Sequence, residues 1–469
     1  MDQTGSFVVP PEWGDRRIYK NLFVLSFGFL FVFTAFQALS NLQSSINCDA
    51  GLGLVSLATI YATLILSCMF APSVIIRYMG LKWTLVISMS CYALYTVANY
   101  LPSWATLIPA SALVGLAAAP LWTAMSTYVT TIGIKHAVIN DERKEDTVAK
   151  FFGFFLLICQ TNQIIGNLIS SLVFRSKEST NINDAQVNDF TCGAQDCSTE
   201  TTEENVTTYC NPPEKMLTNI LLTVYLVCGI TGMFIVVIFL QKFKRNEDKA
   251  EDETCGLFLA TLKLMQNIYF VLMIPFSVYA GLQKAFITAD FTKSYVTCTV
   301  GVEWIGYVMI CYGITIALFS PFWGSLAKLT GRFVIFTTGT IIFGILIVVL
   351  LTWAPKADQL WVMFVSSGLR GVTGAAWETQ MNALYGSLFP NNQQAAFSNF
   401  RLWESVGFTL AFSYSNFLCV WTKLTILATV LGTGFIGYVI LETNEWRLRR
   451  ESSQTDKQEQ NYEAVPVSL

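Results

Sequence analysis

Residues 216–240 read MLTNILLTVYLVCGITGMFIVVIFL, a run of 25 residues without one charged side chain. A helix needs about 20 apolar residues to cross the core of a bilayer, so this run predicts a membrane-spanning helix. The rest of the chain agrees, since 53% of its 469 residues are hydrophobic and 13% are charged. Soluble domains carry about 25% charged residues, because water solvates charge and lipid does not. The sequence therefore predicts a membrane protein and not a soluble enzyme.

Similar runs recur along the chain and predict an all-α, polytopic membrane protein of about twelve transmembrane helices. The expected spans are 21–43, 54–76, 83–101, 104–133, 150–174, 216–240, 267–288, 301–323, 333–353, 360–386, 393–417 and 421–441.

The distribution of basic residues predicts the orientation of these spans. With the N-terminus in the cytosol, twenty Lys and Arg residues fall on the inner side and six on the outer side. Basic residues are retained on the cytosolic side, so both termini are expected there. Residues 1–20 contain no apolar core, so no cleavable signal peptide is expected. The expected parts are an N-terminal tail 1–20, a six-helix bundle 21–240 with outer loop 175–215, a linker 241–266, a second bundle 267–441 and a cytosolic tail 442–469.

Two sequence patterns outside the expected spans suggest glycosylation and membrane sorting. The outer loop contains Asn205-Val206-Thr207, a glycosylation acceptor pattern on the side where glycosylation occurs. The C-terminal tail is expected to be disordered, because residues 451–460 are strongly polar. It contains Tyr462-Glu463-Ala464-Val465, which resembles an adaptor-type sorting pattern. Together they favour a plasma-membrane glycoprotein, with endosomal cycling as a further option.

The chain carries an internal repeat that relates its first half to its second. In the fourth and tenth expected spans, Gly115 and its neighbours recur 256 residues later as Gly371 and its neighbours. After the second and eighth spans, the pattern Arg77-x2-Gly80-x-Lys82 corresponds to Lys328-x2-Gly331-Arg332. Glycine permits a tight turn there, and the basic residues face anionic headgroups. Each loop alone could be an ordinary positively charged turn, but their shared register favours a true repeat.

This arrangement resembles the major facilitator superfamily, whose corresponding loop carries Gly-x3-Asp-x2-Gly-Arg-Arg/Lys. The resemblance implies two pseudo-symmetric six-helix bundles with a cavity between them at the bilayer midplane. Here Arg77 and Lys328 stand at the acidic position. In the superfamily that acid takes part in contacts that latch transporters during cycling. A basic residue cannot make the same pairing, which argues against ordinary transport cycling.

The interiors of the first six expected spans contain no charged residue, whereas spans seven, ten and eleven contain Lys284, Arg370, Glu378, Arg401 and Glu404. Charges at this depth are costly, and they suggest a functional site. Arg370 and Glu378 share one helix face, and so do Arg401 and Glu404. One hypothesis is a polar wall of a central cavity. The alternative is that these residues form charge pairs between helices or snorkel to the interface, as is expected of Lys284 near an outer helix end.

Amide side chains extend the candidate cavity. Gln37 in the first span matches Gln283 in the seventh at an offset of 246, and Gln380 lies in the tenth. Amides can bind a solute through hydrogen bonds, but they also join membrane helices to each other.

Five of the twelve cysteines fall on the expected outer side: Cys48, Cys192, Cys197, Cys210 and Cys298. Disulfides persist on that side. Cys48 and Cys298 lie in equivalent loops of the two halves, so we hypothesise a bond between them that pins the outer ends together. Pairings through the long loop compete with this one, and five cysteines leave one over. Cysteines within spans, among them Cys419, are expected to be apolar fillers.

Several segments resemble the unc-93 family, and within it the homologue A branch. They are Leu42-Gln43-Ser44-Ser45, Cys192-Gly193-Ala194-Gln195-Asp196-Cys197, Ser294-Tyr295-Val296-Thr297-Cys298, Asn382-Ala383-Leu384-Tyr385-Gly386 and Phe400-Arg401-Leu402-Trp403-Glu404. The resemblance covers nearly all of residues 15–445. It implies an accessory role, since one class of the family regulates two-pore-type potassium channels and another escorts Toll-like receptors. The receptor escorts form a different branch, and no ligand residue is carried over.

The sequence therefore favours an accessory or regulatory subunit of a membrane partner, such as a potassium channel. The alternative is a secondary transporter of major-facilitator type for a small organic solute. An enzyme is not expected, because there is no phosphate-binding Gly-x4-Gly-Lys-Ser/Thr loop and no zinc-ligand spacing. With a single histidine, His136, and a net charge of −3, no cofactor and no nucleic-acid partner are expected.

Overall fold

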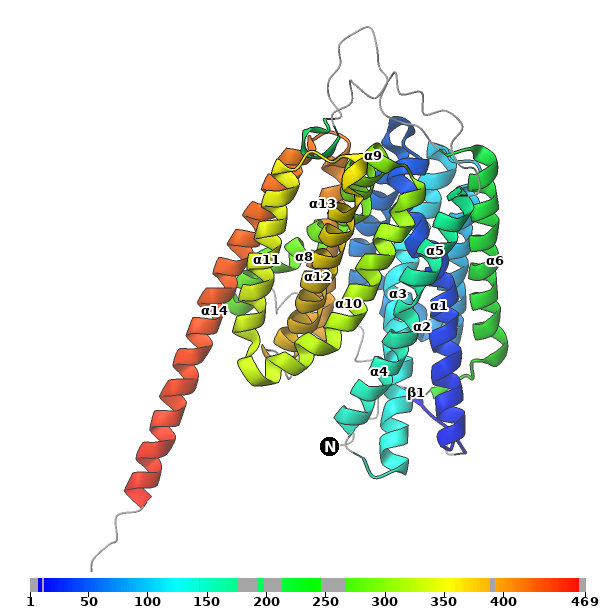
Figure 1. The fold of residues 1–469 in the computed structure, drawn as a ribbon. Coiled ribbons are helices and arrows are strands. Elements are labelled where there is room, and N and C mark those ends of the chain that lie inside the picture. Colours follow the sequence, from blue (N-terminus) through cyan, green and yellow to red (C-terminus); the bar gives the residue numbers. More distant parts are fainter. Residues whose placement is uncertain are drawn as a thin grey trace, which may run out of the picture.

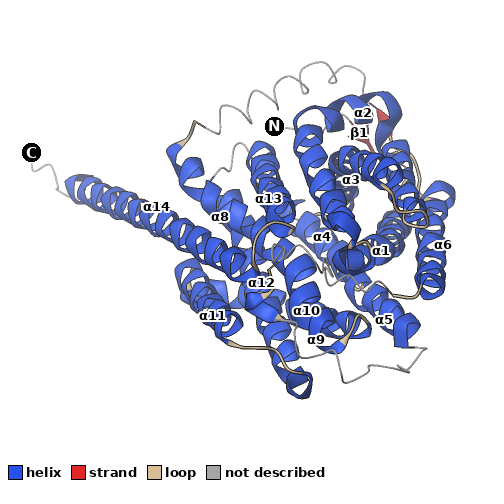
Figure 2. Ribbon diagram, turned by 90° about the horizontal axis from the view of Figure 1, so that it is seen from above, coloured by secondary structure: helices blue, strands red, loops and turns tan. Residues whose placement is uncertain are grey.

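A computed structural model describes the architecture of the chain. It covers residues 7–10, 12–142, 144–175, 192–197, 213–245, 266–388 and 393–463. Nearly all of these residues are helical, and the helices run side by side in two bundles (Figure 1, Figure 2). The strands described are β1 (Phe7–Val8) and β2 (Lys244–Arg245), which pair antiparallel.

The first bundle contains the helices of the N-terminal half. They are α1 (Asp15–Ile46), α2 (Leu52–Ala98), α3 (Trp104–Ile139), α4 (Lys144–Gln160), α5 (Asn162–Arg175) and α6 (Lys215–Phe239). Helix α2 contains two spans, because its backbone leaves the helical conformation at Gly80. Helices α4 and α5 together make one span, Lys150–Phe174.

The second bundle contains the helices of the C-terminal half. They are α8 (Ile268–Ala285), α10 (Glu303–Thr330), α11 (Arg332–Thr352), α12 (Leu360–Leu388), α13 (Gln393–Ser415) and α14 (Val420–Glu463). Helix α8 continues into the π-helix η5 (Phe286–Thr297) and the short α9 (Cys298–Val300), so the seventh span is longer than the sequence predicts. Short 3-10 turns lie at η1 (Asp49–Gly51), η3 (Gly193–Gln195) and η6 (Ala357–Gln359).

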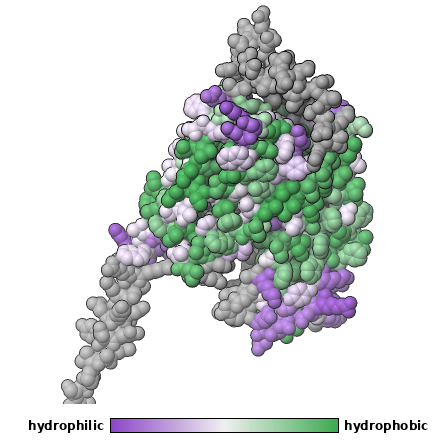
Figure 3. All heavy atoms as spheres, viewed as in Figure 1, coloured by the Kyte–Doolittle hydropathy of each residue, from purple (hydrophilic) through white to green (hydrophobic). Residues whose placement is uncertain are grey.

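The prediction of about twelve spanning helices in two six-helix bundles is confirmed. Ten segments of the described helices are long and apolar enough to cross a membrane. Helices α12 and α13 are long enough but less apolar, because they carry Arg370, Glu378, Arg401 and Glu404. On the face that Figure 3 shows, an apolar band crosses the middle of the molecule, with hydrophilic residues toward the two ends. The chain is therefore a multi-pass membrane protein.

The two ends of the molecule are formed by different connecting segments. We call the end with residues 47–51, 192–197 and 297–302 the loop end, and the end with residues 77–82, 140–142 and 328–332 the tail end. Helix α14 leaves the bundle at the tail end and continues to Glu463 (Figure 1). The expectation of a disordered tail is wrong for residues 442–463. Arg332 pairs with Glu442 and Glu445 and fixes the start of this extension.

The two halves meet along α2 and α13, along α5 and α10, and along α1 and η5. Hydrogen bonds between the halves gather at the loop end. They join Ser44 to Ala289 (3.2 Å), Ser45 to Thr297 (3.2 Å), Ser171 to Glu303 (2.9 Å) and Asn416 to Gly51 (3.2 Å). Toward the tail end the two bundles diverge (Figure 1). The loop end is therefore the closed end of this conformation.

Backbone geometry supports the internal repeat in two places. Gly80 (φ 71°, ψ 166°) and Gly331 (φ 80°, ψ 161°) share one positive-φ conformation at matching turns, which side-chain-bearing residues rarely adopt. A methyl group at Gly115 would overlap the Thr63 hydroxyl and the Ile60 carbonyl across α2 and α3. At Gly371 it would overlap the equivalent groups of Thr315 and Tyr312 across α10 and α12. The repeat thus places one close helix–helix contact in each half.

We expect Gly115→Val and Gly371→Val to destabilise the protein by about 3 kcal/mol each, because overpacking here displaces backbone atoms. Thermal unfolding in detergent, followed by loss of monodisperse protein on gel filtration, measures the effect. Gly153→Val in α4 and Gly344→Val in α11 are matched controls, since nothing lies within 4 Å of a Cβ at either site. Equal melting temperatures for all four variants would contradict the close contacts.

Candidate functional site

Four charged side chains of the C-terminal half form a connected network across three helices. The Nζ of Lys284 on α8 lies 2.7 Å from the Oε1 of Glu378 on α12 and 2.9 Å from the Oε1 of Glu404 on α13. Arg401 Nη1 contacts the other oxygen of Glu404 at 2.6 Å. We call these residues the four-charge network. Two positive and two negative groups are thereby neutralised within one bundle.

Two glycines bring α8 and α13 close enough for this network to form. A methyl group at Gly281 would overlap the carbonyl of Glu404, and one at Gly407 would overlap the carbonyl of Val278. Because each glycine packs against the backbone of the opposite helix, Lys284 reaches the carboxylate of Glu404 directly. The small residues of the sequence thus position the charged ones.

The four-charge network faces the N-terminal half. Tyr61 on α2 stacks on Phe408 of α13, one turn beyond Glu404, with 4.0 Å between ring centroids. The Arg401 side chain is 58% exposed, whereas that of Glu404 is 6% exposed. The network therefore begins at the buried carboxylate of Glu404 and ends at the exposed side chain of Arg401.

The structure corrects the sequence interpretation of Lys284. Snorkelling from an outer helix end is wrong, because its side chain is 21% exposed and bridges two carboxylates. The reason is that α8 continues into η5, so position 284 lies well inside the span. Glu378, Arg401 and Glu404 are brought together through this lysine, as charge pairs between helices.

The remaining candidates lie apart from the four-charge network. Arg370 is buried on α12 and contacts Thr373 at 3.4 Å and the ring of Phe343. Gln283 is fully buried on α8, and Gln380 contacts its neighbour Thr379. Gln37 is partly buried on α1. The matched pair Gln37 and Gln283 therefore remains a hypothesis for the cavity.

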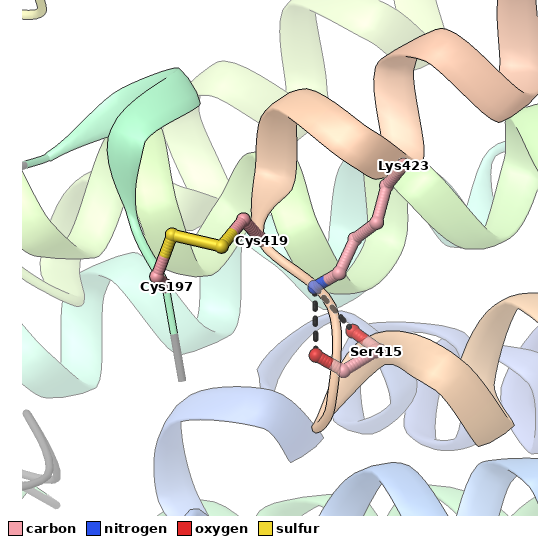
Figure 4. Close-up of a disulfide and its surroundings, with 4 residues drawn as sticks. All are labelled: Cys197, Ser415, Cys419 and Lys423. Atoms are coloured by element: carbon pink, nitrogen blue, oxygen red, sulfur yellow. Dashed lines mark hydrogen bonds between the residues drawn. A yellow bond between two sulfur atoms is a disulfide. The ribbon is translucent and has the colours of Figure 1, made fainter. Parts of the chain in front are cut away.

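A second buried ion pair, absent from the sequence analysis, lies at the loop end. Asp290 of η5 contacts the Nζ of Lys423 on α14 at 2.6 Å, and their side chains are 6% and 4% exposed. Ser415 donates a hydrogen bond to Asp290. The hydroxyl and the carbonyl of Ser415 each accept a hydrogen bond from Lys423 (Figure 4). Sequence reasoning misses Asp290 because it ends the seventh span at residue 288. A longer apolar window through residue 300 would place an acid within a span.

Two disulfides attach residues 192–197 to the C-terminal half. Cys192 bonds to Cys298, and Cys197 bonds to Cys419 beside Lys423 (Figure 4). We call residues 192–197 the cap. Gly193 of the cap packs on Pro355 and Tyr295, and the carbonyl of Asp196 accepts a hydrogen bond from Val420. Since the cap belongs to the loop between α5 and α6, these bonds link the two halves covalently.

The hypothesis that Cys48 pairs with Cys298 is therefore wrong, although Cys48 is itself disulfide-bonded. Cys298 bonds instead to Cys192, because the cap lies on the second half and supplies its partner. The view of Cys419 as an apolar filler is also wrong. Cys210 and the glycosylation candidate Asn205 lie outside the described residues.

The repeated turns at the tail end use their basic residues differently. Arg332 forms ion pairs with Glu442 (2.8 Å) and Glu445 (3.1 Å) of α14, within its own bundle. Arg77 is exposed, and Lys82 is partly buried near Lys242. The side chain of Lys328 lies outside the described part of the structure.

Comparison with known proteins places this chain among membrane proteins of one family. The profile described as "Ion channel regulatory protein UNC-93" matches residues 43–439. Protein unc-93 homolog A of Homo sapiens is 42% identical over 435 residues, which cover 92% of this chain and 94% of that protein. The putative potassium channel regulatory protein unc-93 of Caenorhabditis elegans is 35% identical over 437 residues, covering 91% of this chain and 61% of that protein.

Among solved structures, a point mutant of the nucleoside transporter NupG superposes with a TM-score of 0.62 at 12% identity. The match covers 91% of this chain and 99% of that one. At this identity the likeness establishes a common fold alone, since one fold hosts many functions.

Proposed function

The chain belongs to the UNC-93 family of ion channel regulatory proteins, and we propose that it acts as a non-enzymatic accessory or regulatory subunit of a membrane protein partner. The observation that carries this proposal is the four-charge network, in which opposite charges neutralise each other inside one bundle. A site built to carry a charged solute keeps charge available for that solute. The disulfides of the cap also hold the two halves together permanently at the loop end, which supports a regulatory subunit.

A potassium channel is the partner that we propose. The relative from Caenorhabditis elegans is named a putative potassium channel regulatory protein, and it matches 91% of this chain. Basic residues at the acidic positions of the repeated turns, Arg77 and Lys328, support a regulator over a cycling transporter.

Co-expression with a two-pore-type potassium channel in oocytes tests this proposal. We expect the current amplitude or its voltage dependence to change relative to the channel alone. An unrelated twelve-span transporter, expressed at an equal surface level, is the control for crowding of the secretory pathway. Unchanged currents, with both proteins detected at the surface and across a panel of such channels, would argue against a channel regulator.

The second candidate function is a secondary transporter of a small organic solute. The observation that favours it is exposure of Arg401 between the halves, together with 35% exposure of the Glu378 side chain. Transport predicts solute-dependent flux into proteoliposomes, which Glu378→Gln abolishes. A regulator shows no such flux for any solute of a broad screen.

We further propose a plasma-membrane location with the tail end and both termini in the cytosol. The excess of basic residues on that side supports this orientation. The loop end then faces outward, where the disulfides of the cap are stable. Tyr462 heads the sorting pattern that would allow endosomal cycling.

We expect Asn205→Gln to remove one glycan, because the loop that contains Asn205 then lies in the lumen during synthesis. Wild-type protein from mammalian cells should shift to lower apparent mass after glycosidase treatment, and the variant should migrate at that mass without treatment. Asn211→Gln, in the same loop but outside an acceptor triplet, is the control. A wild-type protein that does not shift would contradict the orientation.

A further inference from the structure

Two lysines from distant parts of the chain lie close together at the tail end of the N-terminal half. The Nζ of Lys242, which follows α6, lies 5.3 Å from the centroid of the Trp83 ring. Lys82 directly precedes Trp83 on α2, and it lies near Lys242. The lysines that form ion pairs between described residues are Lys284 and Lys423. Within the described part of the chain, the fold therefore brings two positive charges together without a carboxylate partner for either.

The chain on both sides of Lys242 is anchored to the N-terminal bundle. The Gln241 amide donates a hydrogen bond to the side-chain oxygen of Asn21 at 2.9 Å, and the Gln241 carbonyl accepts one from Tyr128 at 2.9 Å. The Phe243 ring stacks on Tyr128, with 4.3 Å between ring centroids. Side chains alternate along an extended segment, so residues 241 and 243 face the bundle and Lys242 faces outward, where it is exposed. The position of this lysine is thus set by the fold.

The turn that carries Lys82 is fixed as well. Its backbone reverses at Gly80, which has a positive φ, and the Thr84 hydroxyl donates a hydrogen bond to the Gly80 carbonyl at 2.9 Å. Trp83 is 42% exposed, and tryptophan side chains favour the boundary between lipid and water. Both lysines therefore lie at the level of the lipid headgroups.

Helices α2 and α6 lie side by side between this site and the loop end. Tyr100, just after α2, forms a hydrogen bond with Thr223 of α6 at 2.8 Å, and Lys242 meets Trp83 at the opposite end. These two contacts show that the helices are neighbours across the whole span. Large exposed side chains along the two helices are apolar, and they include Ile87, Leu94, Phe234 and Ile238. The surface that continues from the lysines into the membrane thus suits acyl chains.

The charge of the site selects the headgroup. A phosphomonoester carries a charge of about −1.5 to −2 at pH 7, which matches two lysines better than a phosphodiester or a zwitterion does. We propose that Lys82 and Lys242 bind the phosphomonoester headgroup of a phospholipid whose acyl chains lie along α2 and α6. The lipid belongs to the cytosolic leaflet, a statement that rests on the proposed orientation of the tail end. It neutralises the two charges that the fold brings together.

Native mass spectrometry of the full chain in detergent tests the proposal, with dioleoyl phosphatidic acid, phosphatidylserine and phosphatidylcholine as the probes. We expect phosphatidic acid to bind at lower concentrations than the other two lipids. Lys82→Ala/Lys242→Ala should weaken its affinity about thirtyfold, from about 1 kcal/mol for each basic residue near the headgroups. Lys135→Ala/Lys150→Ala removes the same charge from α3 and α4 at the same end of the molecule. This control should leave the affinity unchanged.

Lys242→Gln is the variant to use if the double variant does not fold, because it alters one exposed side chain; it should weaken the affinity about fivefold. Equal affinities for phosphatidic acid and phosphatidylcholine, or equal losses in the two double variants, would overturn the proposal. So would displacement of phosphatidic acid by an equal concentration of glycerol 3-phosphate, which would assign the lysines to a soluble phosphate ester. Detergent micelles have no sides and no channel is present, so these outcomes are independent of the proposed orientation and of channel regulation.

Discussion

Lys423→Met is expected to destabilise the folded protein by about 3–5 kcal/mol, because it leaves the carboxylate of Asp290 buried without its partner. Asp290 is 4% exposed as a residue and contacts Lys423 at 2.6 Å. The lysine also donates a hydrogen bond to the Ser415 carbonyl at 2.7 Å, so its loss frees a helix end as well. Thermal unfolding in detergent should show a melting temperature several degrees below that of the wild type.

The double variant Asp290→Asn/Lys423→Met should recover most of this loss. The amide oxygen of asparagine can still accept the hydrogen bond from Ser415, and no buried charge remains. Lys356→Met, at an exposed lysine near the same end of the bundle, should leave the melting temperature unchanged. If Lys356→Met and Lys423→Met have the same melting temperature, the buried Asp290–Lys423 pair does not stabilise the folded protein.

Lys284→Met is expected to cost about 3 kcal/mol, because the two carboxylates that Lys284 bridges then face each other without a counter-charge between them. The loss lies at the low end of the range for buried pairs, since Arg401 still contacts Glu404. The same melting assay measures it. Lys284→Met/Glu378→Gln should recover part of the loss by removing one of the two negative charges.

Arg401→Gln separates this effect from the general loss of a cation at membrane depth. The Arg401 side chain is 58% exposed, and Glu404 keeps its contact with Lys284 in the variant. Solvent screens exposed ion pairs, so the expected cost is below about 1 kcal/mol. A larger loss for Arg401→Gln than for Lys284→Met would show that the lysine is not the centre of the network.

The strongest polar contacts of the second bundle lie at two levels, the four-charge network between the halves and the Asp290–Lys423 pair under the cap. Both hold helices of one bundle to each other. Hydrogen bonds and the cap then close the loop end. A bundle whose helices are held together by these contacts keeps one conformation, which suits a protein that binds a membrane partner through a constant surface.

The helical pattern of the fold follows from local features of the sequence. Apolar runs of about 20 residues require helices in lipid, because every backbone polar group must find its partner within the segment. The matching glycines of the two halves are also recognisable from the sequence. Gly80 and Gly331 are recognisable from spacing alone, and both adopt the same positive-φ conformation in the structure. Gly115 and Gly371 match by offset, and both mark close helix contacts.

The seventh span shows where local reasoning stops. Its expected end at residue 288 leaves Asp290 outside the span and puts Lys284 near a helix end, which makes snorkelling the natural interpretation. The structure extends the helix through η5 to Thr297. Burial of that extension between α1 and the second bundle makes the longer, partly polar helix stable, and that burial is a tertiary property.

The sequence by itself determined that this protein lies in a membrane, that it has about twelve spans in two related halves, and that it resembles the unc-93 family. Hydrophobic length and glycine spacing are properties of neighbouring residues, so they can be recognised before the chain is folded. Only the tertiary structure decided the charge partners of Lys284 and Lys423 and the attachment of the cap through Cys298 and Cys419. Such pairings join residues from about 100 to more than 200 positions apart along the chain, and only the packing of the helices sets which of them meet.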